Sequence, residues 1–262
     1  MAHFSWERWW GPYVHLTRMR RLREIIQFVK CTLHGLSYLH SLRIVHRDIC
    51  DQNVVVNCHS PGATLKEFPE LLDEHRKADD VTYAFIDFGQ SLQLPPETSI
   101  IDCRRPGDET AIAMNRFKPP DGRLAEPYYN PFSYDVAALG FVYRYYFSEA
   151  VTAFPGLAAL FDRMTDWCPS RRMTAQEVLQ WFEELIAKVP PATLDAGVVL
   201  LPNFGAIREE GFYWTKLSPE DQLRWGRYRT PPSPWWRRLL GWIAKQQIGW
   251  RVLYFVREAL QI

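Results

Sequence analysis

The chain has 262 residues, and its 31 Lys and Arg almost balance 30 Asp and Glu, giving a formal net charge of +1. This balance excludes a protein whose overall charge drives it onto nucleic acid. A composition with 47% hydrophobic and 15% aromatic residues also excludes wholesale disorder. Because there is no signal-peptide core, no spanning run and no Cys-x-x-Cys pair, we expect an intracellular protein, cytoplasmic or nuclear, without a disulfide scaffold or zinc site.

The first half of the chain predicts one long helix and two strands. Residues 1–23 form a leader with three tryptophans and no strand pattern. From Glu24, apolar residues recur at three- and four-residue steps, which predicts an amphipathic helix to about His40. Strands are predicted at 54–56 and 81–86. Residues 58–80, between them, are interpreted as a solvated insertion with a short helix at about 69–77.

The second half predicts three helices after an irregular region. Residues 90–133 contain seven prolines, so we expect little regular structure there. The segment 134–147 is apolar nearly all round, which predicts a buried helix. Two more helices are predicted at 154–164 and 174–187, the second with a capping box of Thr174 and Glu177. Residues 188–222 are interpreted as a linker, and 223–262 as a basic, Trp-rich tail.

Four short motifs follow one another within this pattern. They are His46-Arg47-Asp48 with Asn53 in register, Asp87-Phe88-Gly89 after a predicted strand, Asp135 on the buried helix, and Arg172 before the last helix. Either of the first two alone is a weak signal, but their order and spacing are specific. Over residues 24–187 the series resembles the C-terminal lobe of the eukaryotic protein kinase family. The insertion and the Pro-rich segment look like those of fungal protein-kinase-like proteins.

The resemblance implies a mainly α (α+β) fold, a helical lobe with short β-strands. The family's N-terminal lobe, a five-stranded sheet with a Gly-rich loop and a strand Lys, needs roughly 65 residues. Only 45 residues precede His46, and Gly11, Gly35 and Lys30 are the only Gly and Lys residues among them. We therefore expect that lobe to be missing, either by design or because the gene product is truncated. The leader tryptophans could cover part of the surface left open.

The resemblance also assigns the chemistry. Asp48 would take the proton from a protein hydroxyl that receives the γ-phosphate of ATP, with Arg47 beside it. Asn53 and Asp87 would hold Mg²⁺, which prefers oxygen ligands, and Val55 would form the apolar floor under adenine. The remaining motif residues would support the site: His46, Phe88 and Gly89 in the core of the lobe, Asp135 as acceptor of loop N–H groups, and Arg172 paired with Asp121. Arg47 would meet a phosphate or an acid of the activation segment.

The catalytic loop departs from the family in two places. Cys50 stands where Ser/Thr kinases usually have a Lys, and Gln52 does not restore the cation of tyrosine kinases. Losing that cation weakens transition-state stabilisation, so we expect weak Mg·ATP binding and little phosphorylation by this chain. A Ser/Thr acceptor is favoured over Tyr. The alternatives are a pseudokinase or scaffold, and a small-molecule phosphotransferase, although such enzymes usually have Gly at position 47.

The tail allows two interpretations. Residues 223–262 carry eight basic residues and one acid, Glu258, with Trp235, Trp236, Trp242 and Trp250 among them. The aromatic residues could dock on the lobe, or an amphipathic helix could lie on an anionic membrane. Docking is favoured because Gly241 and Gly249 interrupt a clean helical pattern. Nucleic-acid binding is a distant third, since no recognised module accompanies the charge.

Overall fold

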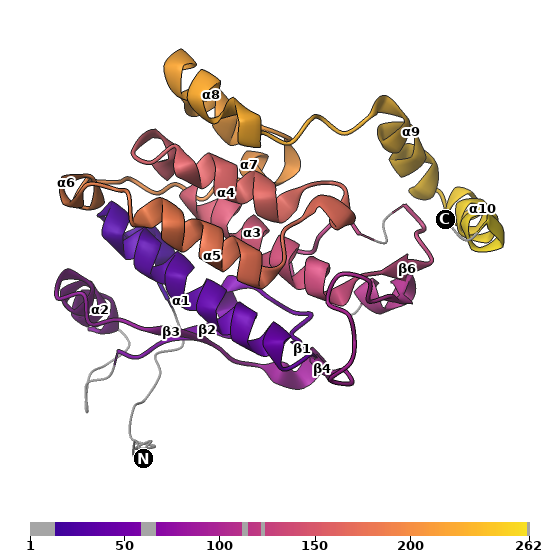
Figure 1. The fold of residues 1–262 in the computed structure, drawn as a ribbon, viewed down its shortest axis with the longest axis horizontal. Helices are drawn as coiled ribbons and strands as arrows, with labels where there is room; N and C mark the ends of the chain where they lie inside the picture. The colour runs from indigo at the N-terminus through magenta and orange to yellow at the C-terminus, as the bar shows by residue number, and fades with distance from the viewer. Residues whose placement is uncertain (1–13, 59–66, 112–114, 122–123, 261–262) are drawn as a thin grey trace.

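The computed structural model describes residues 14–58, 67–111, 115–121 and 124–260, and Trp6, Trp9 and Trp10 of the predicted leader lie outside this part. The described chain is mainly helical, with three short two-stranded sheets, in agreement with the mainly α prediction. Four helices form its centre (Figure 1): α1 (Leu22–Ser41), α3 (Pro131–Phe147), α4 (Gly156–Thr165) and α5 (Ala175–Ile186). The predicted helix ends are reproduced within a few residues, and the predicted capping box of Thr174 and Glu177 opens α5.

Helix α3 is the core of the lobe, as its apolar sequence predicts. It begins at Asn130, whose side chain accepts a hydrogen bond from the Ser133 N–H at 3.0 Å. All but one of its residues are buried. Gly140 allows the close approach of α4, because a Cβ there would lie 2.6 Å from Thr165 Cγ2 and 2.8 Å from Met164 Cβ. This contact fixes the crossing of α3 and α4.

The strands are short and antiparallel. Strand β1 (Ile44–Val45) pairs with β4 (Leu92–Gln93), β2 (Val54–Val56) with β3 (Tyr83–Phe85), and β5 (Arg105–Pro106) with β6 (Tyr128–Tyr129). The second pair confirms the two predicted strands. Val54 and Val56 face the core cluster, so Val55 points to the opposite side of the ladder. The 3₁₀ turns η1 (Leu16–Arg18), η2 (Asp51–Asn53), η3 (Phe88–Gln90), η4 (Gly107–Ala111), η5 (Ala150–Thr152) and η6 (Pro169–Arg171) occupy the connections.

The predicted insertion is attached more firmly than a solvated loop. Its helix α2 (Phe68–Lys77) buries Arg76, whose side chain is 1% exposed. The Arg76 guanidinium donates hydrogen bonds to Tyr83 Oη at 3.1 Å, to the His15 carbonyl at 3.3 Å, and to the Val14 carbonyl. The charged run therefore joins the described end of the leader to the β2–β3 sheet instead of facing water throughout.

The segment 188–222 is not an extended linker. It contains α6 (Pro191–Leu194), α7 (Gly205–Arg208), η7 (Phe212–Lys216) and α8 (Pro219–Trp225), and it runs along the far side of α3 and α4 (Figure 1). Tyr213 and Trp214 are both 1% exposed and belong to the core cluster. The lobe therefore continues past residue 187, and the tail begins after this packed segment.

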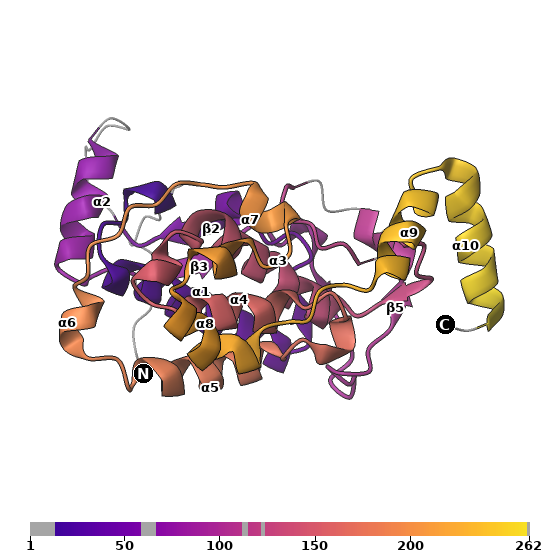
Figure 2. The same ribbon diagram turned by 90° about the horizontal axis from the view of Figure 1, so that it is seen from above.

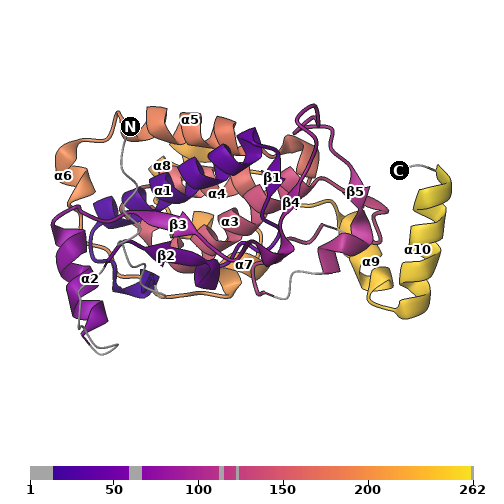
Figure 3. The same ribbon diagram turned by 90° about the horizontal axis from the view of Figure 1, so that it is seen from below.

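The tail forms two helices at one end of the molecule. After η8 (Gly226–Tyr228), helices α9 (Trp235–Ala244) and α10 (Gln247–Leu260) extend away from the central helices (Figures 2 and 3). Docking, the favoured interpretation, is seen for α9 alone, where Arg237 lies over the Trp167 ring at 5.2 Å and 3.6 Å from Glu126. Within the described residues, no helix is both long and apolar enough to cross a membrane.

Candidate functional site

Asp135 holds the loop that carries the first motif. Its Oδ2 accepts hydrogen bonds from the His46 N–H at 2.6 Å and from His40 Nε2 at 3.3 Å, and its Oδ1 accepts from the Arg47 N–H at 2.8 Å. Arg47 has φ of 66°, in the left-handed region that a non-glycine residue enters only when its surroundings hold it there. The sequence-based role of Asp135, as acceptor of loop N–H groups, is confirmed.

His46 joins this loop to the second motif. Its Nε2 lies 3.0 Å from the Ile86 carbonyl, and its ring lies 5.1 Å from Phe88 and 5.6 Å from Phe85. His46 is fully buried, as expected. Phe88 is 46% exposed, so its stacking on His46 does not take it into the core as predicted. Gly89 donates its N–H to Asp87 Oδ1 at 3.4 Å, which turns the chain just after the motif's carboxylate.

Arg47 is committed to neighbouring groups. Its NH1 donates to Glu109 at 3.0 Å, and its Nε donates to the Gln90 carbonyl at 2.7 Å. Glu109 also pairs with Arg105. The prediction that Arg47 meets an acid of the Pro-rich segment is therefore confirmed, and Glu109 is that acid. The sequence offered no signal that singled it out from Glu97 or Asp102.

Two amides hold the Asp48 carboxylate. Asn53 Nδ2 donates to Oδ2 at 3.1 Å and to the Asp48 carbonyl at 2.8 Å. Asn115 Nδ2 donates to Oδ1 at 2.6 Å from the Pro-rich segment. Asn115 was missed in the sequence because it belongs to no motif and reaches Asp48 across 67 residues. The carboxylate is thus fixed in direction and keeps further lone pairs for another donor.

The β2–β3 register brings Asn53 and Asp87 together. Val54 pairs with Phe85, and the Ile86 N–H donates to the Asn53 carbonyl at 3.0 Å, so Asp87 follows the residue opposite Asn53. Because Asn53 Nδ2 binds Asp48, its Oδ1 is the atom left for a cation. An amide oxygen and an exposed carboxylate fit Mg²⁺, which takes its other ligands from phosphate and water. Among the described residues, no three His, Cys, Asp or Glu side chains gather as a metal cage.

Val55 and Cys50 complete the neighbourhood of Asn53. Val55 is 4% exposed on the side of β2 away from the core cluster, the side on which an adenine floor was expected. Cys50 is buried, and burial raises the pKa of its thiol, so the thiolate is disfavoured at neutral pH. Asp51, the next residue, accepts a hydrogen bond from Tyr146 Oη at 2.6 Å, a tie to α3 that no motif indicated.

The pair expected at the end of the Pro-rich segment is present. Arg172 donates from both terminal nitrogens to the two oxygens of Asp121, each at 2.6 Å, and both side chains are buried. Its Nε donates to the Asp166 carbonyl at 2.7 Å. This two-bond geometry anchors the segment after Asn115 to the start of α5.

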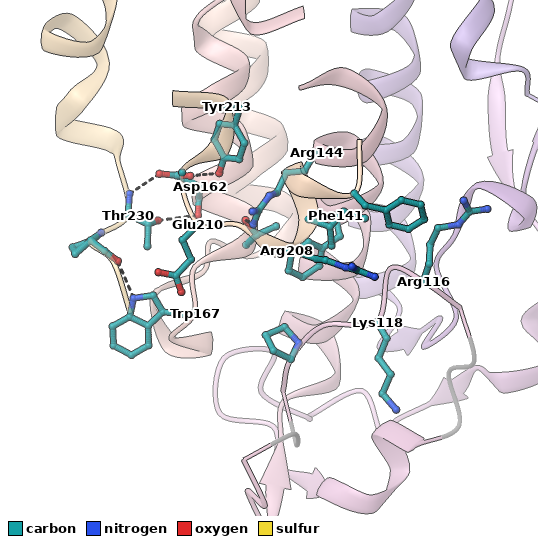
Figure 4. A pocket seen from close by; sticks show the side chains of 16 residues that line it. Arg116, Lys118, Phe141, Arg144, Asp162, Trp167, Arg208, Glu210, Tyr213 and Thr230 are labelled. Atoms are coloured by element: carbon teal, nitrogen blue, oxygen red, sulfur yellow. Dashed lines mark hydrogen bonds between the residues drawn. The ribbon is translucent and has the colours of Figure 1, made fainter. Parts of the chain in front are cut away.

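A cavity of about 560 Å³ lies between α3, α4 and the segment 204–231 (Figure 4). On one side of it, Asp162 accepts hydrogen bonds from Tyr213 Oη, from Trp214 Nε1 at 3.0 Å and from the Thr230 N–H at 2.6 Å. Burial raises the pKa of Asp162, and these donors oppose that rise. On the other side, Arg144 donates to the Ala206 carbonyl at 2.7 Å. These bonds attach the segment to the lobe.

Comparison of the chain with known proteins adds no family to these observations. No protein-family model matches it. No curated protein matches its sequence at a significant level.

Proposed function

We propose that the chain is the C-terminal lobe of a protein-kinase-type phosphotransferase, which transfers the γ-phosphate of ATP to a protein hydroxyl. The observation that carries the proposal is the arrangement of Asp48, Asn53 and Asp87: the β2–β3 register puts Asn53 beside Asp87, and Asn53 holds Asp48. Two oxygen donors for Mg²⁺ next to a fixed carboxylate are the parts that phosphoryl transfer needs, since it depends on positioning and charge neutralisation.

Each residue then has a stated task. Asp48 orients the acceptor hydroxyl and takes its proton while the new O–P bond forms and the bond to the β-phosphate oxygen breaks, releasing ADP. Asn53 and Asp87 would hold Mg²⁺, which neutralises the phosphates. Arg47 is a positioning residue, because its donors are used on Glu109 and Gln90.

A second candidate, an interaction protein of the pseudokinase type, is favoured by the loop composition. Cys50 and Gln52 leave the loop after Arg47 without a cation for the transferred phosphate. The 45 residues before His46 contain no Gly-rich segment to cover phosphates, and both Asp48 oxygens already accept amide bonds. The two candidates differ in whether any phosphoryl transfer depends on Asp48.

The test is phosphoryl transfer by the full chain, with γ-labelled ATP, Mg²⁺ and a mixture of basic and acidic acceptor proteins. We expect slow transfer that Asp48→Asn and Asp87→Ala abolish, and weak Mg·ATP binding with a dissociation constant of about 1 mM or above. Asp80→Asn is the matched control, because Asp80 is 77% exposed. Equal label in the wild type and both site variants would reject the enzyme and leave the interaction protein.

A further inference from the structure

Helix α10 presents a continuous apolar face to solvent. Its exposed apolar residues are spaced at i, i+4, i+7, i+8 and i+12, which is one side of an α-helix: Ile248, Val252, Phe255, Val256 and Leu260. Phe255 is 70% exposed and Ile248 78%. The other side carries Trp250 and Tyr254, whose rings stack at 5.1 Å.

Helix α9 repeats the arrangement. Trp235, Leu239 and Trp242 follow one another at i, i+4 and i+7 and are all exposed, Trp235 at 70% and Trp242 at 65%. Its other side contacts the lobe through Arg237, and Gly241 lies against Leu124, where a Cβ would be 3.4 Å from Cδ2. One side of α9 is therefore fixed, and the side with the tryptophans is free of the lobe.

The two glycines build this arm (residues 235–260) instead of breaking it. Both helices continue through them, Gly241 within α9 and Gly249 within α10. A Cβ at Gly249 would lie 2.2 Å from the Ile243 carbonyl oxygen, so only glycine permits the tight corner between the helices. The reason for which the sequence favoured docking over a membrane therefore does not hold.

We propose that this arm binds the surface of an anionic lipid bilayer. Residues 223–262 carry eight basic residues and one acid, and Arg238, Lys245 and Arg251 are exposed beside the apolar faces. Apolar and aromatic side chains on one side of a helix with Arg and Lys beside them are the pattern of helices that lie in the lipid headgroup region. The positive charge selects an anionic surface over a neutral membrane or an apolar protein partner. Docked in this way, the arm would hold the Asp48 site close to a membrane.

The experiment is co-sedimentation of the full chain with vesicles of phosphatidylcholine alone or mixed with phosphatidylserine. We expect binding to the mixed vesicles that falls about tenfold or more in Val252→Asp/Phe255→Asp and in Arg238→Glu/Lys245→Glu, and that weakens with added salt. Leu223→Asp is the matched control, because Leu223 is an 86% exposed apolar residue outside the arm. It should bind as the wild type does.

Two results would overturn the proposal. One is equal sedimentation with and without phosphatidylserine, or no loss in either double variant. The other is a dimer in solution that Val252→Asp/Phe255→Asp converts to a monomer while vesicle binding is absent, which would assign the apolar face to a second copy of the chain. Thermal melts of all variants show whether they are folded, and exposed positions of this kind should leave the melt unchanged.

Discussion

At the scale of single residues, the shape of the first motif depends on Asp135. Asp135→Ala leaves the buried N–H groups of His46 and Arg47 without an acceptor, and we expect a loss of about 3–5 kcal/mol in the free energy of unfolding. Asp135→Asn keeps one acceptor oxygen and should lose less, about 1–2 kcal/mol. Urea unfolding measures both. Equal losses in the two variants would mean that the carboxylate's charge, not its acceptor geometry, holds the loop.

Tyr129 gives a pH dependence at the same scale. Burial raises its pKa to about 12, against an ordinary value of 10.0, although Arg47 lowers it. The folded state therefore holds the phenol proton more tightly than the unfolded chain does. The contribution of Tyr129 is fully present below pH 10 and is lost as the pH rises to 12, a total of about 3 kcal/mol.

The measurement is the free energy of unfolding between pH 9 and pH 12, about one unit on either side of the ordinary tyrosine pKa and above. Tyr129→Phe should flatten part of the decline seen in the wild type. Tyr128→Phe is the control, because the neighbouring ring is 53% exposed. An unchanged slope in Tyr129→Phe would show that Tyr129 does not titrate in this range.

At the scale of elements, periodicity in the sequence is sufficient for the long helices and fails for the segment 188–222. The spacing of apolar residues located α1 and α3, and Thr174 with Glu177 located the start of α5. Residues 188–222 contain only short helices and 3₁₀ turns, which are too brief to show a period. Their burial arises from single large side chains that meet distant partners, such as Trp214 on Asp162.

This packed segment can be tested with a matched pair of tryptophans. Trp214 is 1% exposed and Trp242 is 65% exposed. We expect Trp214→Ala to cost about 3–5 kcal/mol, because it leaves a cavity and removes a donor from buried Asp162. Trp242→Ala should cost less than about 0.5 kcal/mol. Similar costs in the two variants would contradict the continuation of the lobe past residue 187.

The candidate site shows the same division between local and distant signals. Asp48, Asn53 and Asp87 were found because each lies in a short motif, and the strand pairing between them follows from two Val- and aromatic-rich runs. Asn115 and Glu109 lie in the Pro-rich segment, where the backbone has no period that would place them. Only the three-dimensional path of this segment, anchored by Asp121 on Arg172, brings them to the loop.

At the scale of the whole molecule, the described residues up to about 231 form one packed body to which the arm is attached. Thr230 donates to Asp162 at 2.6 Å, and Trp167 Nε1 donates to the Pro231 carbonyl at 3.0 Å, so the chain is tied down as far as this point. No residue of α9 or α10 is buried. Stability should therefore depend on residues 203–231 and hardly on the arm.

Two truncations separate these contributions. Ending the chain after Pro234 removes both helices of the arm, and we expect the melting temperature to fall by no more than about 4 °C, since only the rim contacts of α9 are lost. Ending it after Pro202 removes Tyr213, Trp214 and Thr230, the partners of buried Asp162, so a cooperative melt should disappear. Scanning calorimetry measures both. A large fall from the first truncation would mean that the arm contributes to the core, and its apolar faces would then be committed to the lobe instead of to a bilayer.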